Sequence, residues 1–239
     1  MKIHCLFEQS GTFRDEFRSL GYQSTNYDID NQFNKTDWVI DIFEEIDNFR
    51  FKPTIFSTIE KDDLVIAFFP CTYFCEMNNL LLTHKSQNYK NLTYDQTENK
   101  IQERKKERTI FLEYFKKLIK ISDEIGFGLI IENPYHLNHL LEVHKRPEII
   151  IKNRRLYGDW FVKPTGFWCY NFEPKHNFIS LHLPKNQELK RLKTSINTKN
   201  AKHSKVLTVR NTKGIERSLI SSYFAKNFIR KYILEQETY

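Results

Sequence analysis

Cysteines are few in this sequence, and long apolar runs are missing. The four cysteines include one close pair, Cys71 and Cys75, with three residues between them and no second pair downstream. This is not the spacing of a zinc site, so we expect no metal and a reduced compartment. No segment approaches the roughly 20 consecutive apolar residues of a membrane-spanning helix, and residues 1–7 lack a signal-peptide layout. We therefore expect a soluble, cytoplasmic protein without a membrane partner.

Negative charge is also in the minority, although only slightly. Asp and Glu number 30 against 37 Lys and Arg, which gives a formal net charge of +7. Such an excess favours a polyanionic partner through counterion release, but many ordinary proteins are equally basic. With 239 residues, 40% of them hydrophobic, the chain is long enough to bury a full core. We expect one large α/β domain, alone or with a small lobe.

The first part of the chain alternates strand-like and helix-like segments. Residues 1–7 form a short apolar run, apolar residues recur at helical spacing over residues 13–20, and a second run over residues 22–29 ends in acids. This is the opening of a doubly wound sheet. Residues 63–68 form the next strand, which is apolar as strands buried on both faces of a parallel sheet usually are.

A long helix and another buried strand follow. Apolar positions between residues 99 and 125 fit one helix face, and the first part of this helix is basic over residues 104–108. Residues 129–131 form a buried strand that ends at Glu132. Because ligands in open α/β sheets bind at the carboxyl ends of the strands, we expect Cys71 and Glu132 to meet in one crevice with the first loop.

The pattern predicts three parts of the chain. Residues 1–170 form the main domain, which contains the crevice where Cys71, Glu132 and the first loop are expected to meet. Residues 171–213 have few apolar positions and many Lys, Asn, Ser and Thr, which indicates a small basic excursion or a reduced recognition lobe. Residues 214–239 regain helical periodicity and return to the main domain as a C-terminal helix.

Cys71 follows a buried strand directly and is a candidate nucleophile. At the rim of a sheet, helix amino termini and basic groups can favour its thiolate. The alternative is that Cys71 is a small buried hydrophobe among aromatic residues. Glu132, at the end of its strand, is partly desolvated and equipped to share a proton with a ring nitrogen, or it is a cap or ion-pair partner.

Glycine is scarce in the loop after the first strand. Ser10-Gly11 provides one small position where related nucleotide folds often have two or three glycines, so a simple strand-to-helix turn is an alternative. Asp28 lies 17 residues beyond Gly11, near the distance at which an acid binds ribose hydroxyls in this type of fold. The two features together favour a nucleotide-like cofactor.

In their order and spacing, these pieces resemble the cytosine-C5 DNA methyltransferases, especially their short phage-type members. Residues 6–13 resemble the first cofactor loop, Pro70-Cys71 the catalytic Pro-Cys, and Glu132-Asn133 the catalytic Glu-Asn. Further matches are residues 28–30, 41–42, 157–159, 163–168 and 216–220. The resemblance implies a Rossmann-like sheet of the S-adenosylmethionine-dependent methyltransferase type, with a mostly parallel, doubly wound arrangement.

The resemblance also implies three groups of site residues. The catalytic residues are Pro70, Cys71, Glu132, Asn133 and, as part of an arginine-rich segment, Arg155. The cofactor-binding residues are Phe7, Ser10, Gly11, Thr12, Phe13, Asp28, Ile29, Asp41, Ile42 and Phe69. The DNA-binding residues are Arg104, Lys105, Arg108, Lys163 and Thr165.

The implied reaction is methyl transfer from S-adenosylmethionine to C5 of a cytosine in DNA. Cys71 adds to C6, Glu132 stabilises the charge on the ring, and Asn133 positions the carboxylate or its loop. The target atoms are inaccessible inside a duplex, so the base is flipped into the pocket, or the substrate is a single strand. The family's large target-recognition domain is absent, so any sequence specificity comes from residues 171–213 or from loops.

Two other functions stay open. The same scaffold could act on a free pyrimidine nucleotide or an RNA, because little surface is left to read a duplex. It could also be an inactive methyltransferase fold kept as a DNA-binding or partner-binding module. Glu8 and Gln9 support that alternative, because they stand where the family usually has small residues. Cys71 and Glu132 are the evidence against it.

Overall fold

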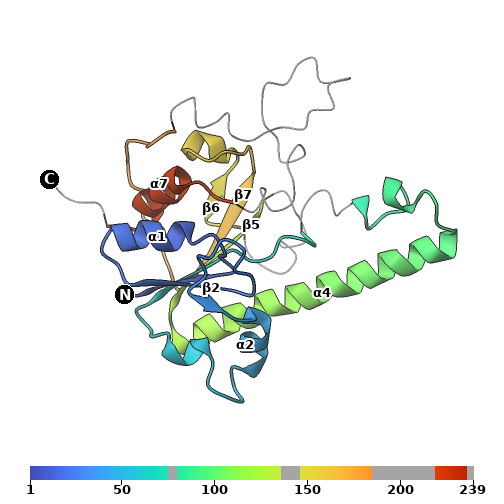
Figure 1. The fold of residues 1–239 in the computed structure, drawn as a ribbon, viewed down its shortest axis with the longest axis horizontal. Coiled ribbons are helices and arrows are strands. Elements are labelled where there is room, and N and C mark those ends of the chain that lie inside the picture. The colour runs from blue at the N-terminus through green and yellow to red at the C-terminus, as the bar shows by residue number, and fades with distance from the viewer. Residues whose placement is uncertain (75–79, 136–145, 185–218, 236–239) are drawn as a thin grey trace.

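The computed structural model describes residues 1–74, 80–135, 146–184 and 219–235 (Figure 1). The strands are β1 (Ile3–Leu6), β2 (Ser24–Asp28), β3 (Trp38–Val39), β4 (Leu64–Ala67), β5 (Gly128–Pro134), β6 (Ile149–Ile151) and β7 (Thr165–Tyr170). The α-helices of the described residues are α1 (Thr12–Ser19), α2 (Ile42–Asn48), α4 (Tyr94–Ile125) and α7 (Ser222–Tyr232). Short 3-10 helices cover Ile55–Thr58 (η1), Gln87–Tyr89 (η2) and Arg154–Tyr157 (η3).

The seven strands form one sheet in the order β3-β2-β1-β4-β5-β7-β6. Pairing is parallel from β3 to β5, whereas β7 is antiparallel to both β5 and β6. This is the doubly wound order 3-2-1-4-5-6 with β7 inserted before the last strand. The prediction of an α/β fold with a mostly parallel sheet is confirmed, and the arrangement is compatible with a Rossmann-like fold.

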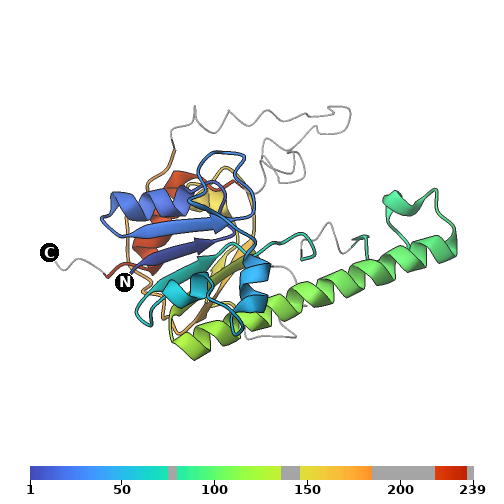
Figure 2. The ribbon, with the colours of Figure 1, turned by 60° about the horizontal axis from the view of Figure 1, so that its bottom comes forward.

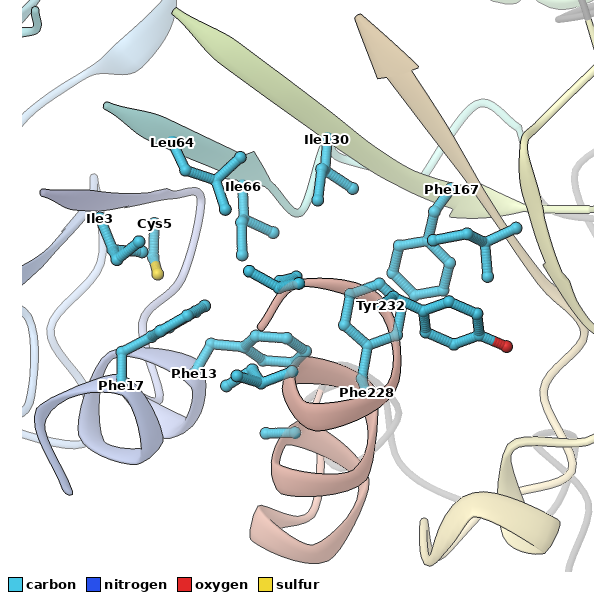
Figure 3. Close-up of a cluster of buried hydrophobic side chains, with 14 of the residues drawn as sticks. Ile3, Cys5, Phe13, Phe17, Leu64, Ile66, Ile130, Phe167, Phe228 and Tyr232 are labelled. Carbon is cyan, nitrogen blue, oxygen red and sulfur yellow. The ribbon is translucent and has the colours of Figure 1, made fainter. Parts of the chain in front are cut away.

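Helices cover both faces of the sheet, as the alternation of strand side chains requires. On one face, Ile3, Cys5 and Ile66 pack against residues of α1 and α7, including Phe13 and Phe228 (Figure 3). On the other face, the next residues along the same strands pack against α2 and α4. α7 thus brings the end of the chain back to the main domain, against α1.

The helix α4 is longer than the sheet it covers. The sequence pattern predicted its start near residue 99, but it begins at Tyr94, where Thr93 and Gln96 form a capping box, and ends at Gly126. Figure 2 shows its first half extending away from the sheet. Residues of the loop before it fold back on this half, because Nε2 of His84 lies 2.8 Å from Oε2 of Glu98 and the His84 ring stacks on that of Tyr94.

The predicted excursion is described only in part, since residues 185–213 lie outside the described residues. Its first part runs along α7, where the Asn177 side-chain amide donates to the carbonyls of Arg230 and Leu234 at 2.9 and 2.8 Å. The C-terminal helix was predicted from about residue 218 and begins at Ser222, capped by the Ser221 hydroxyl. Among the described residues, no helix is both long and apolar enough to cross a membrane.

Candidate functional site

The two predicted catalytic side chains follow neighbouring strands. Ala67 of β4 pairs with Ile131 of β5, so Glu132 ends one strand beside the segment that leads to Cys71. Asn133 joins the two strand ends, because its side-chain amide donates to the Phe69 carbonyl at 3.0 Å. Cys71 is half-buried and forms no disulfide within the described residues, whereas Glu132 is only 5% exposed. The sheet thus brings a thiol and a buried carboxylate to one edge.

Two cations flank the Glu132 carboxylate. Nη1 of Arg154 and Nζ of Lys163 each lie 3.6 Å from its Oε1. Within the described residues this oxygen makes no hydrogen bond, although it is buried. A buried oxygen without a hydrogen bond destabilises the fold even when cations balance its charge. Oε1 of Glu132 is therefore suited to accept a hydrogen bond from a ligand.

Besides Glu132, two other groups hold the Arg154 side chain. Its guanidinium lies 4.5 Å from the centroid of the Phe224 ring on α7, and its Nη2 lies 2.5 Å from Oδ2 of Asp159. Asp159 in turn accepts from the backbone N–H groups of Trp160 and Ser221 at 2.8 and 3.2 Å. The Arg154 side chain is 1% exposed, so its orientation is set by tertiary contacts rather than by solvent.

The arginine beside Glu132 is therefore Arg154, not the neighbouring Arg155 that the sequence analysis chose. Arg155 is half-buried, and its backbone N–H is bound by the Asn153 side chain at the start of η3. The sequence analysis missed Arg154 altogether. One signal in the sequence could have found it, because a buried strand-end carboxylate needs a cation. Arg154 and Arg155 are both candidates for that cation, and which of them faces Glu132 depends on the orientation of η3.

Lys163 and Thr165 do not lie where a phosphate contact was expected. Lys163 points at Glu132, and its side chain is 16% exposed. Thr165 is fully buried at the start of β7, and its hydroxyl donates to the Lys163 carbonyl at 3.1 Å. In this position the Thr165 side chain offers no surface to DNA.

The loop that carries Cys71 is attached to α4 through Tyr73. The Tyr73 ring lies 4.7 Å from the Phe111 ring, centroid to centroid. Burial and a hydrogen bond with Glu107 raise the pKa of Tyr73, and the nearby Arg104 opposes this rise. Arg104, one of the predicted DNA-binding residues of α4, therefore lies near the loop that carries the candidate nucleophile.

In the first loop, Glu8 takes over the capping of α1. Gly11, at the N-cap position, has φ +64°, and because glycine has no side chain it cannot cap the first helical N–H groups. The buried Glu8 carboxylate accepts from the N–H groups of Phe13 and Arg14 at 2.6 and 3.3 Å. Burial raises the pKa of Glu8 to about 7 despite these hydrogen bonds. The unexpected acid thus has a structural role in the loop.

Gly11 has no room for a side chain. A Cβ there would lie 2.6 Å from Nη2 of Arg14, whose guanidinium is held through Nη1 by Asn26 and Asp37. The loop needs a residue without a Cβ at this positive φ. Of the other predicted cofactor residues here, Phe13 is a core residue, and the hydroxyls of Ser10 and Thr12 lie 3.0 Å apart.

The second strand delivers an acid and an exposed apolar side chain to the same edge. Burial raises the pKa of Asp28, whose carboxylate accepts from the Asp30 N–H at 2.8 Å. Ile29 is 62% exposed. Asp41 caps α2 by accepting from Phe43 and Glu44, so this predicted adenine-side acid also has a structural role. Its neighbour Ile42, predicted with it, is a core residue.

Two hollows differ in their relation to this edge. A small one of about 40 Å³ lies between the first loop and residues 219–220, and Glu8, Ser10 and Phe68 help to line it. A larger one of about 300 Å³ lies between α2 and α4, lined by residues such as Phe49 and Lys117. The larger hollow lies toward the C-terminal ends of α2 and α4, which are at the opposite edge of the sheet from the strand carboxyl ends. We therefore assign it no part in the site.

Because Glu8 is buried and carries a raised pKa, the stability contributed by this region depends on pH. Its protonated form is favoured in the folded chain, so the stabilisation is present at low pH and is lost as the pH rises from about 4.5 through about 7. We expect Glu8→Gln to remove this slope. The free energy of unfolding of the wild type minus that of the variant, measured by urea unfolding, should change by about 3 kcal/mol between pH 4.5 and 8. A pH-independent difference would contradict the buried position of Glu8.

Comparison with known proteins identifies no family for this chain. No protein-family model matches the chain, and no curated protein matches it. What the described residues define is a class: an α/β protein with a thiol and a cation-flanked carboxylate at adjacent strand ends.

Proposed function

We propose that this protein is a DNA cytosine-C5 methyltransferase that uses Cys71 as nucleophile. The observation that carries the proposal is the pairing of Cys71 and Glu132 at neighbouring strand ends, joined by the hydrogen bond from Asn133 to the Phe69 carbonyl. The sheet order is compatible with the proposal, because β3 to β5 pair in parallel in the doubly wound order expected from the sequence. The edge that holds both side chains is where such folds bind ligands.

Cytosine C5 is a poor nucleophile until a thiolate adds to C6. In the proposed reaction a bond forms between Sγ of Cys71 and C6, and the electron pair of the C5=C6 bond moves through the ring toward N3. After methylation, a base removes the C5 proton, the C5=C6 bond re-forms, and the Cys71 thiolate leaves. None of the residues described above is assigned as that base.

Glu132 is suited to hold the ring during addition. Its Oε1, which makes no hydrogen bond within the described residues, can accept from the exocyclic amine of cytosine. The carboxyl group can also share a proton with N3, where electron density accumulates. Arg154 and Lys163 keep the carboxylate in place from two sides. Pro70 and Asn133 act as positioning residues for the two strand ends.

The residues at the ends of β1 and β2 fit S-adenosylmethionine. The Asp28 carboxylate is at the edge where ribose hydroxyls would bind, and the exposed Ile29 offers an apolar surface to an adenine. The hollow between the first loop and Ile220 lies beside the end of β1, because Phe7 and Glu8, which follow this strand, help to line it. When bound, this cofactor supplies an electrophilic methyl group for the activated C5.

Glu8 was the main support for an inactive binding module, because it departs from the small residues of the family. In the structure its carboxylate caps α1, which is a structural reason for an acid at this position. Among DNA, RNA and a free nucleotide we favour DNA, because Pro70-Cys71 and Glu132-Asn133 resemble the catalytic pairs of DNA methyltransferases.

The test is methyl transfer by the purified full chain. S-adenosylmethionine with a labelled methyl group is incubated in parallel with duplex DNA, single-stranded DNA, RNA and cytidine nucleotides, and the label is followed into 5-methylcytosine. Transfer to either DNA supports the proposal. Transfer to RNA or nucleotides alone replaces it with the second enzyme, and transfer to none of them, together with no cofactor binding, leaves the binding module.

Glu132→Gln is expected to lower kcat without a comparable rise in KM. Gln keeps the shape and can accept from the exocyclic amine, but it cannot share a proton with N3. Loss of one such charge-stabilising group costs roughly 10²- to 10³-fold in kcat. Single-turnover methyl transfer measures this effect, with circular dichroism as the folding control. A variant within a few-fold of wild type would exclude Glu132 from the chemistry.

A further inference from the structure

The first half of α4 has no sheet to cover. A helix of 32 residues is about 48 Å long, whereas β5, the longest strand with 7 residues, spans only about 23 Å. α4 connects the carboxyl end of β4 to the amino end of β5, so it runs antiparallel to both and its first half lies beyond the carboxyl edge. That is the edge with Cys71 and Glu132, and Figure 2 shows the helix passing beyond the sheet.

One face of this projecting half continues the core-facing side of the helix. Residues three and four apart on a helix share a face. Phe115 is buried in the core, Phe111 packs against it, and the next positions on this face are Arg108, Glu107 and Arg104. These three are half-buried, whereas Lys105 and Lys106 are exposed on other faces. Glu107 is hydrogen-bonded with Tyr73, so the inner face changes from aromatic to charged where the sheet ends, with two arginines as its cations.

The same face meets the loop of the candidate nucleophile. Phe111 contacts the Tyr73 ring, and Arg104 is close enough to affect the Tyr73 pKa. A strand whose base reached Cys71 would therefore have its flanking phosphates near Arg108 and Arg104. Residues 80–110 also carry seven Lys or Arg against four Asp or Glu, so this short segment supplies a large part of the chain's net charge of +7.

We propose that the inner face of projecting α4, defined by Arg104 and Arg108, binds the phosphates beside the target base. It provides backbone contacts that hold the nucleic acid over the site in a chain that lacks a large recognition domain. Its geometry refines the sequence expectation, because Lys105 stands on a different face. The choice of DNA as the partner rests on the proposed function, but binding to this face does not depend on methyl transfer.

The experiment compares two pairs of substitutions with equal charge change. Arg104→Gln/Arg108→Gln alters the inner face, and Lys105→Gln/Lys106→Gln alters the outer faces of the same helix turns. Binding to a fluorescent single-stranded or duplex oligonucleotide is measured over a salt series without cofactor. We expect the inner pair to weaken binding roughly tenfold or more and to lower the duplex salt slope by about 2. Substitution of the outer pair should weaken binding by less than a third of the fold-change that the inner pair causes.

Each outcome decides the inference separately from the reaction. If the two pairs of substitutions weaken binding equally, or if the inner pair does not weaken it, the inference is wrong. Equal weakening would show that binding depends on the total charge of the helix rather than on its inner face. Arg104→Lys/Arg108→Lys keeps the charge and should retain most of the binding, which separates phosphate contact from damage to the Tyr73 loop. If wild type transfers methyl groups but the inner pair binds normally, only this inference fails. If wild type binds through Arg104 and Arg108 without any transfer, only the proposed reaction fails.

Discussion

Cys71→Ala is expected to abolish methyl transfer and to leave cofactor binding intact. The thiolate provides the bond to C6 without which C5 does not become nucleophilic, and no second thiol stands at the same strand end among the described residues. Loss of a catalytic nucleophile typically costs on the order of 10⁶-fold in kcat. Labelled methyl transfer measures the rate, and titration calorimetry with S-adenosylmethionine measures cofactor affinity.

The covalent adduct gives an independent readout of the same residue. DNA with 5-fluorocytosine carries fluorine in place of the proton that must leave C5, so elimination of Cys71 is blocked after methyl transfer. Wild type should then form a protein–DNA complex that survives denaturing electrophoresis, and Cys71→Ala should form none. Cys169→Ala is the matched control, because Cys169 is 2% exposed in the core. A trapped complex in the Cys71 variant would assign the nucleophile elsewhere.

Arg154→Met is expected to cause the largest loss of stability among the site variants. It leaves two buried carboxylates, Glu132 and Asp159, without the cation they share. Removing one partner from a buried ion pair typically costs about 3–5 kcal/mol, because the remaining charge is uncompensated. Urea unfolding followed by circular dichroism measures the change in the free energy of unfolding.

Two controls identify the cause of this loss. Arg155→Met changes the neighbouring arginine, which is half-buried, and should cost less than about 1 kcal/mol. Adding Asp159→Asn to Arg154→Met removes one uncompensated charge while keeping Oδ1 as an acceptor for Trp160 and Ser221, and should recover part of the stability. Equal costs for the two arginine variants would contradict the buried ion pair.

Cys71 and Glu132 could be found in the sequence because of where they stand. Each follows an apolar run, and a run buried on both faces of a parallel sheet has no polar alternative until it ends. The first polar or reactive residue after such a run is therefore at the strand's carboxyl edge. The bounds were less accurate: α4 begins at Tyr94 because of the capping box at Thr93, which precedes the periodic part of the helix.

The sequence by itself determined the α/β class, four of the seven strands (β1, β2, β4 and β5), and the edge at which the candidate residues meet, because these follow from the local hydrophobic period. It did not predict β3, β6 or β7, which are short or lie at the sheet's antiparallel end. Only the tertiary structure decided which side chains complete the site. Arg154 rather than Arg155 reaches Glu132 because Phe224 and Asp159, far apart in the chain, hold its guanidinium. Glu8 is a helix cap because of the turn at Gly11. The choice of Arg154 depends on contacts between distant segments, and a local pattern contains no information about them.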